Sequence, residues 1–108
     1  MKITDVEAII VRQPDGITLI GDGTQDTAIV LVHTDAGITG AAEVDSAPYV
    51  VKAIIDMPAS HSACQELREL VVGEDPFDVE KIWNKMYTYA YYHGRAAAVI
   101  HAMSGIDN

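Results

Sequence analysis

The spacing of the apolar residues changes once along this chain, and that change limits the folds open to it. Up to residue 44 they alternate or run together in short segments, which is typical of β-strands. From Ser46 onward they recur every three or four residues, which is typical of helices. Strands followed by helices predict an α+β fold, with a three-stranded antiparallel meander in residues 1–44 and a bundle of about four helices in residues 46–108. A single domain is expected for 108 residues, of which 49% are hydrophobic.

Three segments are predicted as strands. Residues 3–12 alternate between apolar and polar, whereas residues 27–34 are apolar on both faces and suit a central or doubly covered strand. Gly37 can adopt a positive φ in the tight connection that follows, and residues 38–44 return as the third strand. This third strand contains small residues that would let another element approach closely: Gly40, Ala41 and Ala42.

Four helices are predicted, at residues 48–57, 62–72, 76–92 and from about residue 95 to the end. Asp75 is expected to cap the third helix. The fourth ends without a Gly or Pro stop signal, although it has one apolar stripe formed by Val99, Ala102, Met103 and Ile106. We therefore expect this stripe to meet a partner outside the 108 residues.

Charge and cysteine content exclude several classes of protein. The net charge of −9 argues against a nucleic-acid partner or an anionic membrane surface, because both would repel the chain. No apolar run reaches membrane-spanning length. Cys64 is the single cysteine, so no intrachain disulfide can form, which fits a cytoplasmic location. We expect its side chain to be a small buried residue on the second predicted helix.

Five motifs occur in order along the chain: MKITDVE at 1–7, TDAGITGAAE at 34–43, VGEDPFDVEKIW at 72–83, HGR at 93–95 and AMSGID at 102–107. Together they resemble the N-terminal domain of the mandelate racemase/muconate lactonizing enzyme family, within the enolase superfamily. Ala42 stands where the family has the second glycine of its Gly-x-Gly-Glu motif. The resemblance covers essentially all of residues 1–108, but only the front quarter or third of a family member.

The resemblance implies that the chemistry lies in a C-terminal barrel domain that these residues do not include. In such enzymes three barrel carboxylates bind Mg²⁺, and a barrel base removes the proton α to a carboxylate. We therefore assign no catalytic residue, metal ligand or cofactor to this chain, and expect Mg²⁺ in the barrel. The implied partners are that barrel, a small carboxylate substrate at the domain interface, and further copies of the protein in a homo-oligomer.

Two loops are expected to close the barrel mouth. By position they are residues 13–25 and 44–49, and the residues expected to face substrate are Ile17, Leu19, Ile20, Asp22, Asp45 and Ser46. An alternative stays open for each loop. The apolar residues of the first loop would fold back on the core, and Asp45 with Ser46 would merely begin the connection to the first helix.

Two functions follow from this reading. The first is a capping domain, inactive by itself, of a dehydratase, racemase or cycloisomerase that acts on an acid sugar or hydroxy acid. The second is a free-standing α+β interaction module without catalysis. The module predicts a fourth helix packed on its own domain, whereas the missing stop signal favours exposed apolar surface on that helix.

Overall fold

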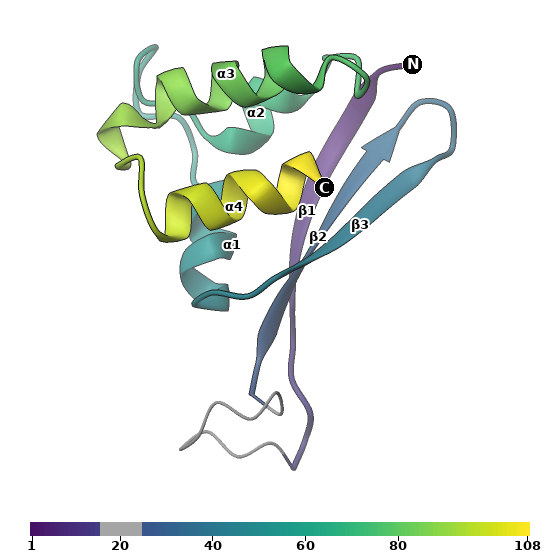
Figure 1. Ribbon diagram of the computed structural model, residues 1–108, viewed down its shortest axis with the longest axis vertical. Coiled ribbons are helices and arrows are strands. Elements are labelled where there is room, and N and C mark those ends of the chain that lie inside the picture. Colours follow the sequence, from purple (N-terminus) through teal and green to yellow (C-terminus); the bar gives the residue numbers. More distant parts are fainter. Residues whose placement is uncertain (16–24) are drawn as a thin grey trace.

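The computed structural model of the chain describes residues 1–15 and 25–108, and it has the predicted α+β architecture. A three-stranded sheet is followed by the helices, and Figure 1 shows these to one side of it. The elements are β1 (Ile3–Val11), β2 (Thr27–Thr34), β3 (Thr39–Val44), α1 (Pro48–Asp56), α2 (Leu67–Val71), α3 (Val79–Tyr89), the 3₁₀ helix η1 (Ala90–Tyr92) and α4 (Ala98–Asp107).

The sheet is antiparallel in the order β1-β2-β3, so β2 is the central strand. Gly37 has φ 75°, as expected for the tight β2–β3 connection, where the Thr34 amide donates to the Ile38 carbonyl at 3.0 Å. The β1–β2 register shifts between Ile3 and Asp5. Because of this bulge, Ile3 and Val6 are both buried although three positions separate them.

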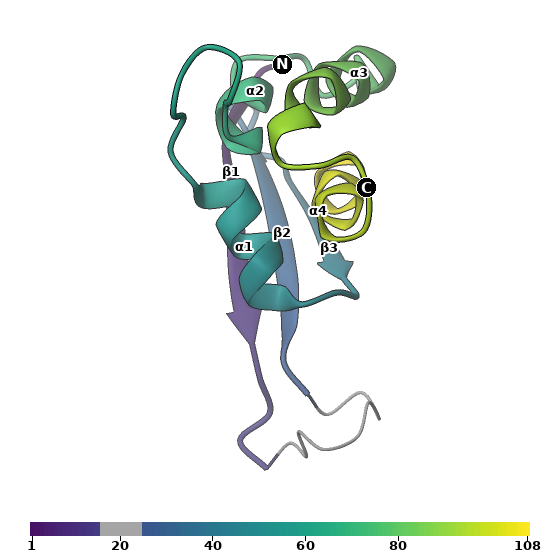
Figure 2. The ribbon, with the colours of Figure 1, turned by 90° about the vertical axis from the view of Figure 1, so that its left-hand side faces the viewer.

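The core lies between the sheet and the helices, as the view in Figure 2 shows. Val6, Val30 and Val44 face it from the three strands. All four members of the α4 stripe are buried there as well: Val99, Ala102, Met103 and Ile106. The expectation that this stripe needs an outside partner is therefore wrong, because it packs against the domain's own sheet and helices.

The outer face of the sheet is not covered by any described helix. Ile29 and Leu31 on β2 are only partly buried there, and Ile9 on β1 is 39% exposed. The apolar pattern of residues 27–34 predicted a central or doubly covered strand, and the first alternative is confirmed because β2 is the central strand.

Helix α4 reaches the sheet closely at Gly105. A Cβ built at this position would lie 2.5 Å from Val44 Cγ2 and 3.0 Å from Val30 Cγ2. By contrast, a Cβ at Gly40 would meet nothing within 4 Å. The close approach predicted from the small residues of β3 is thus made by a glycine on the helix instead.

Several helix boundaries differ from those predicted. The second helix begins at Leu67 and not near residue 62, because residues 61–64 form a tight turn in which the Cys64 amide donates to the His61 carbonyl at 2.9 Å. Cys64 therefore lies outside α2 and is partly exposed. The third helix begins at Val79, after Asp78.

Asp75 does not cap that helix. Its carboxylate accepts from the Phe77 amide at 3.0 Å and so closes a turn before it. Helix α4 begins at Ala98, three residues later than expected, and Ala97 immediately before it has a positive φ of 49°. No described helix is long and apolar enough to cross a membrane.

Cationic side chains from two helices hold the edge strand β1. Lys52 Nζ donates to the Ala8 carbonyl at 2.7 Å, and Arg68 Nε donates to the Val6 carbonyl at 2.8 Å. Asp56 accepts from both cations. These contacts occupy carbonyls of an edge strand that would otherwise be available to another chain.

Candidate functional site

The two predicted substrate-facing loops leave from the same end of the sheet. Ala28 on β2 lies opposite Ile10 on β1 and opposite Val44 on β3, so residue 45 begins beside the β1–β2 connection. Asp45 is exposed there and Ser46 is partly buried. The other four predicted residues lie outside the described residues: Ile17, Leu19, Ile20 and Asp22.

The first turn of α1 adds an aromatic side chain to this end of the molecule. Pro48 occupies the first turn, suits it because its missing N–H would have no partner, and is buried. Tyr49 beside it is 70% exposed. Tyr49 therefore adds an exposed aromatic ring to the segment that follows Asp45 and Ser46.

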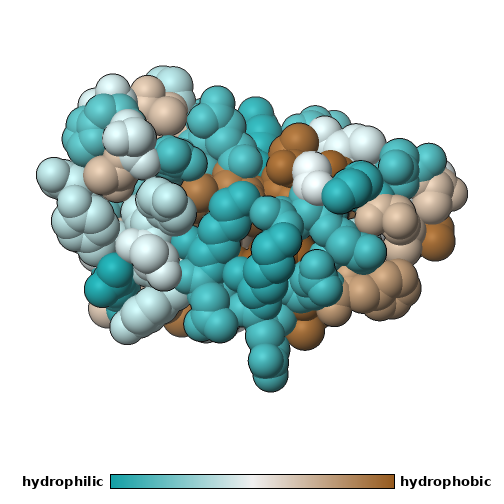
Figure 3. Space-filling model, turned by 90° about the horizontal axis from the view of Figure 1, so that it is seen from above, coloured by the Kyte–Doolittle hydropathy of each residue, from teal (hydrophilic) through white to brown (hydrophobic). Residues whose placement is uncertain are grey.

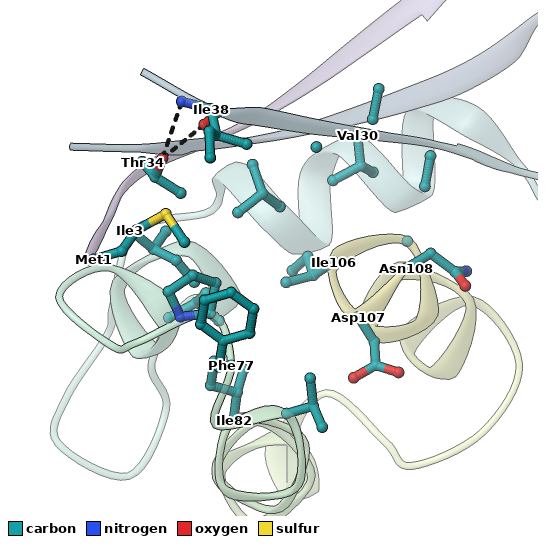
Figure 4. A pocket seen from close by; sticks show the side chains of 18 residues that line it. Met1, Ile3, Val30, Thr34, Ile38, Phe77, Ile82, Ile106, Asp107 and Asn108 are labelled. Carbon is teal, nitrogen blue, oxygen red and sulfur yellow. Dashed lines mark hydrogen bonds between the residues drawn. The ribbon is translucent and has the colours of Figure 1, made fainter. Parts of the chain in front are cut away.

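Elsewhere the molecule has an apolar groove of about 290 Å³ between the sheet and the helices. Its walls come from all three strands, the turn before α3, α3 itself and the last turn of α4. Figure 4 shows the side chain of Ile106 pointing into the space between the sheet and α3, with Phe77, Met1 and Ile3 grouped at one end.

The groove is open and strongly apolar. Phe77 is 78% exposed, Ile38 59% and Val79 51%. In Figure 3, which looks onto the end of the molecule near α3, hydrophobic side chains show between hydrophilic ones. Exposed apolar side chains gathered around one groove are typical of a surface that another polypeptide covers.

Few polar groups line the groove. They are Thr34, Asp107 and Asn108, and the Thr34 hydroxyl already donates to the Ile38 carbonyl at 2.8 Å. Among the described residues no lining side chain is a cation that could bind a carboxylate, and Asp107 would repel one. The groove is therefore suited to an apolar protein segment and not to an acid sugar.

Two lysines of α3 are engaged in ion pairs with Glu74. Lys81 Nζ lies 2.5 Å and Lys85 Nζ 2.9 Å from the carboxylate oxygens of Glu74. Hydrogen bonds from these two ammonium groups lower the pKa of Glu74 to about 2. In residues 1–15 and 25–108, no three His, Cys, Asp or Glu side chains are grouped in a way that could hold a metal ion.

Comparison with known proteins identifies the family. Residues 2–108 match the sequence model of the mandelate racemase/muconate lactonizing enzyme N-terminal domain. The chain belongs to this family. The predicted resemblance and the predicted α+β fold are both confirmed.

Among curated relatives of this N-terminal domain are two sugar-acid dehydratases. L-rhamnonate dehydratase of Saccharopolyspora erythraea is 29% identical over 96 residues, which are 89% of this chain and 21% of that protein. D-galactonate dehydratase of Xanthomonas campestris pv. campestris is 37% identical over 76 residues, 70% of this chain and 18% of that protein. The chain thus spans about one fifth of the length of these relatives.

Solved structures agree with this assignment. A predicted mandelate racemase from Rhodobacter sphaeroides has a TM-score of 0.74 at 26% identity, covering 94% of this chain and 25% of its own. A mandelate racemase/muconate lactonizing enzyme from a marine actinobacterium, solved in complex with magnesium, has a TM-score of 0.61 at 26% identity, covering 82% and 22%. In such relatives a further domain follows the part that matches this N-terminal domain.

The groove could not be found from the sequence. Met1, Ile38, Phe77 and Ile106 are far apart along the chain and belong to different elements. Only Ile106 belongs to a periodic stripe, and that stripe is explained by the core. The exposed Phe77, in the motif shared with the family, is the one signal that could have indicated it.

Proposed function

We propose that this N-terminal domain caps the barrel of a Mg²⁺-dependent enzyme that removes the proton α to the carboxylate of a sugar acid or hydroxy acid. The observation that supports it most is the family match over residues 2–108. Two curated relatives are a rhamnonate and a galactonate dehydratase, which favours dehydration of a sugar acid over racemisation or cycloisomerisation. The base and the metal ligands would belong to the barrel, in the cytoplasmic enzyme.

The loops at the β1–β2 end of the sheet would close over the substrate. Strand β1 ends and β2 begins at that end of the sheet, and the segment with Asp45 and Ser46 starts there too, followed by exposed Tyr49. Closing such loops excludes water from the reacting centre and contributes contacts that select the substrate. These residues supply no proton transfer in this account.

The apolar groove would receive part of the same polypeptide from beyond this domain. Asp107 and Asn108 line it, so a chain that continues past them emerges beside it. About four fifths of each of these curated relatives lies outside the matched part. An apolar segment from that remaining part, packed against Phe77 and Ile38, would hold the capping domain on the barrel.

The activity is tested by turnover. The isolated 108-residue chain, given Mg²⁺ and a panel of sugar acids, is expected to form no keto acid, while the longer product of the same gene forms it from at least one member. Turnover by the pure 108-residue chain, or a longer product lacking a barrel, would contradict the proposal.

The groove is tested separately. In the longer product, Phe77→Asp is expected to make the junction after residue 108 sensitive to limited proteolysis, because it places a charge in an apolar interface. Val72→Asp, on an exposed side chain outside the groove, is the matched control. Equal resistance of the two variants would show that the groove does not seat the next domain.

One observation favours the second candidate, a free-standing interaction module. Helix α4 packs on its own domain, as that function predicts, with Val99, Met103 and Ile106 buried. The packing shows that the domain has a self-contained core, a property that a capping domain can share. The mass of the natural protein distinguishes the two functions.

A further inference from the structure

A thiol and an imidazole meet on the helical side of the domain, away from the groove and the loops. Cys64 Sγ lies 3.7 Å from His93 Nε2, within hydrogen-bonding range for sulfur. Cys64 belongs to the α1–α2 connection, and His93 follows η1. A cysteine and a histidine at this separation are the two groups needed for a nucleophilic thiol whose proton has an acceptor.

Backbone hydrogen bonds fix both residues. The turn holding Cys64 is closed by the Cys64 amide donating to the His61 carbonyl and the Ser60 amide donating to the Cys64 carbonyl, each at 2.9 Å. The His93 amide donates to the Ala90 carbonyl at 3.0 Å. The contact between the side chains is therefore set by two ordered segments, and Cys64 as a residue is only partly buried.

The imidazole is neutral and has a single polar partner in the described chain. Burial lowers the pKa of His93, so the ring is uncharged at pH 7. Its Nδ1 is buried without a hydrogen-bond partner among residues 1–15 and 25–108, which leaves the thiol at Nε2 as the group it can exchange a proton with.

Three aromatic side chains and one arginine lie near the segments that hold Cys64 and His93. His61 meets the Tyr92 ring edge-on at 5.2 Å between centroids, and Tyr91 packs on Tyr92 at 4.4 Å. The Arg95 guanidinium lies 5.9 Å from the centre of the Tyr91 ring. Arg95 also donates to the Tyr87 and Thr88 carbonyls, which ties the segment after His93 to the end of α3.

We propose that Cys64 and His93 form a nucleophilic dyad through which this domain accepts a small disulfide as a covalent modification. The Cys64 thiol gives its proton to His93 Nε2 while Sγ attacks one sulfur of the disulfide. A new S–S bond forms, the old S–S bond breaks, and the departing thiolate takes the proton from His93 to leave as a thiol. Cys64 ends oxidised in a mixed disulfide, and one sulfur of the reagent ends reduced.

The modification would persist until an external thiol removes it. Cys64 is the only cysteine in the 108 residues, so no second thiol in them can displace the group. The attached group would also separate Sγ from His93 and so loosen the link between the α1–α2 connection and the turn before α4. This inference does not depend on the proposed enzymatic function.

The experiment exploits the single thiol. The rate at which bis(2-hydroxyethyl) disulfide adds to the 108-residue chain is followed by intact mass, for the folded chain and for the same chain unfolded in urea. At pH 7 the folded chain is expected to react about tenfold faster, because His93 accepts the thiol proton during the attack. A folded chain that reacts no faster than the unfolded one overturns the dyad.

Two variants test the role of His93. His93→Gln is expected to reduce the folded rate to that of the unfolded chain, whereas His101→Gln, on an exposed histidine of α4, leaves it unchanged. Circular dichroism establishes that each variant is folded. If His93→Gln disturbs the fold, the comparison of the folded and unfolded wild-type chains decides, because it needs no substitution. An unchanged rate in folded His93→Gln contradicts the proposal.

Discussion

Replacing Gly105 by alanine tests how α4 is seated on the sheet. A Cβ at this buried position would be 2.5 Å from Val44 Cγ2 and 3.0 Å from Val30 Cγ2. Ordinary carbon–carbon contacts are about 3.5–4.0 Å, so the first distance is about 1 Å too short. Val30 and Val44 are 0% and 3% exposed, and neither can turn its methyl groups into solvent.

The net change in the free energy of unfolding is the cost of overpacking minus the gain in helix propensity. Overpacking of this kind costs about 1–3 kcal/mol, and the short distance to a branched side chain places Gly105→Ala in the upper part of that range. Alanine recovers about 1 kcal/mol because it is the better helix former. We therefore expect a net loss of about 1–2 kcal/mol, which lowers Tm by about 5–10 °C in a domain of this size.

Urea unfolding followed by fluorescence of Trp83, the single tryptophan, measures this loss. The double variant Gly105→Ala with Val44→Ala lacks the clashing methyl group. We therefore expect it to be about 1 kcal/mol more stable than the sum of the two single effects predicts, a favourable coupling. Ser104→Ala, one position earlier in the same helix, is the control and should change stability little. If Gly105→Ala is as stable as wild type, or the coupling is absent, the described seating of α4 is incorrect.

Three further predictions concern single positions. Ala97 has φ 49° and ψ −122°, a conformation that favours glycine, so Ala97→Gly should stabilise the chain by about 1 kcal/mol in thermal unfolding, whereas Ala96→Gly should not. The folded pKa of Glu74, about 2, lies below its ordinary 4.5, so its stabilisation is present above about pH 5 and lost as pH falls toward 2. Urea unfolding should therefore show that Glu74→Gln is about 1 kcal/mol less stable than wild type at pH 7, but equally stable at pH 2. The loss is this small because solvent screens the ion pair between Glu74 and the exposed Lys81. Phe77→Asp in the 108-residue chain should reduce fluorescence of a bound hydrophobic dye without lowering Tm, since this side chain is 78% exposed.

The fold was predictable because its determinants are local. The alternation of β1, the glycine at the β2–β3 turn and the stripe of α4 each specify an element without knowledge of its neighbours. The residues at which the helices begin were harder to predict. Asp75 and Asp78 are both good caps by residue type, and only the turn that Asp75 closes shows which one precedes the helix.

The candidate site was predictable only in part, since its features arise from packing. The positions of Asp45 and Ser46 follow from strand order, and the register that brings the two loops to one end follows from the meander. The groove depends on where α4 ends relative to α3 and the sheet, and no local sequence pattern specifies that position. The Cys64–His93 contact joins residues 29 positions apart, so spacing along the chain gave no indication of it.

The intact mass of the natural protein, purified from the cells that make it, tests the capping role most directly. The account predicts a mass several times that of 108 residues, with peptides from a following barrel that holds three carboxylates as metal ligands. A natural protein of 108 residues, or one whose remaining part is not a barrel, would contradict it.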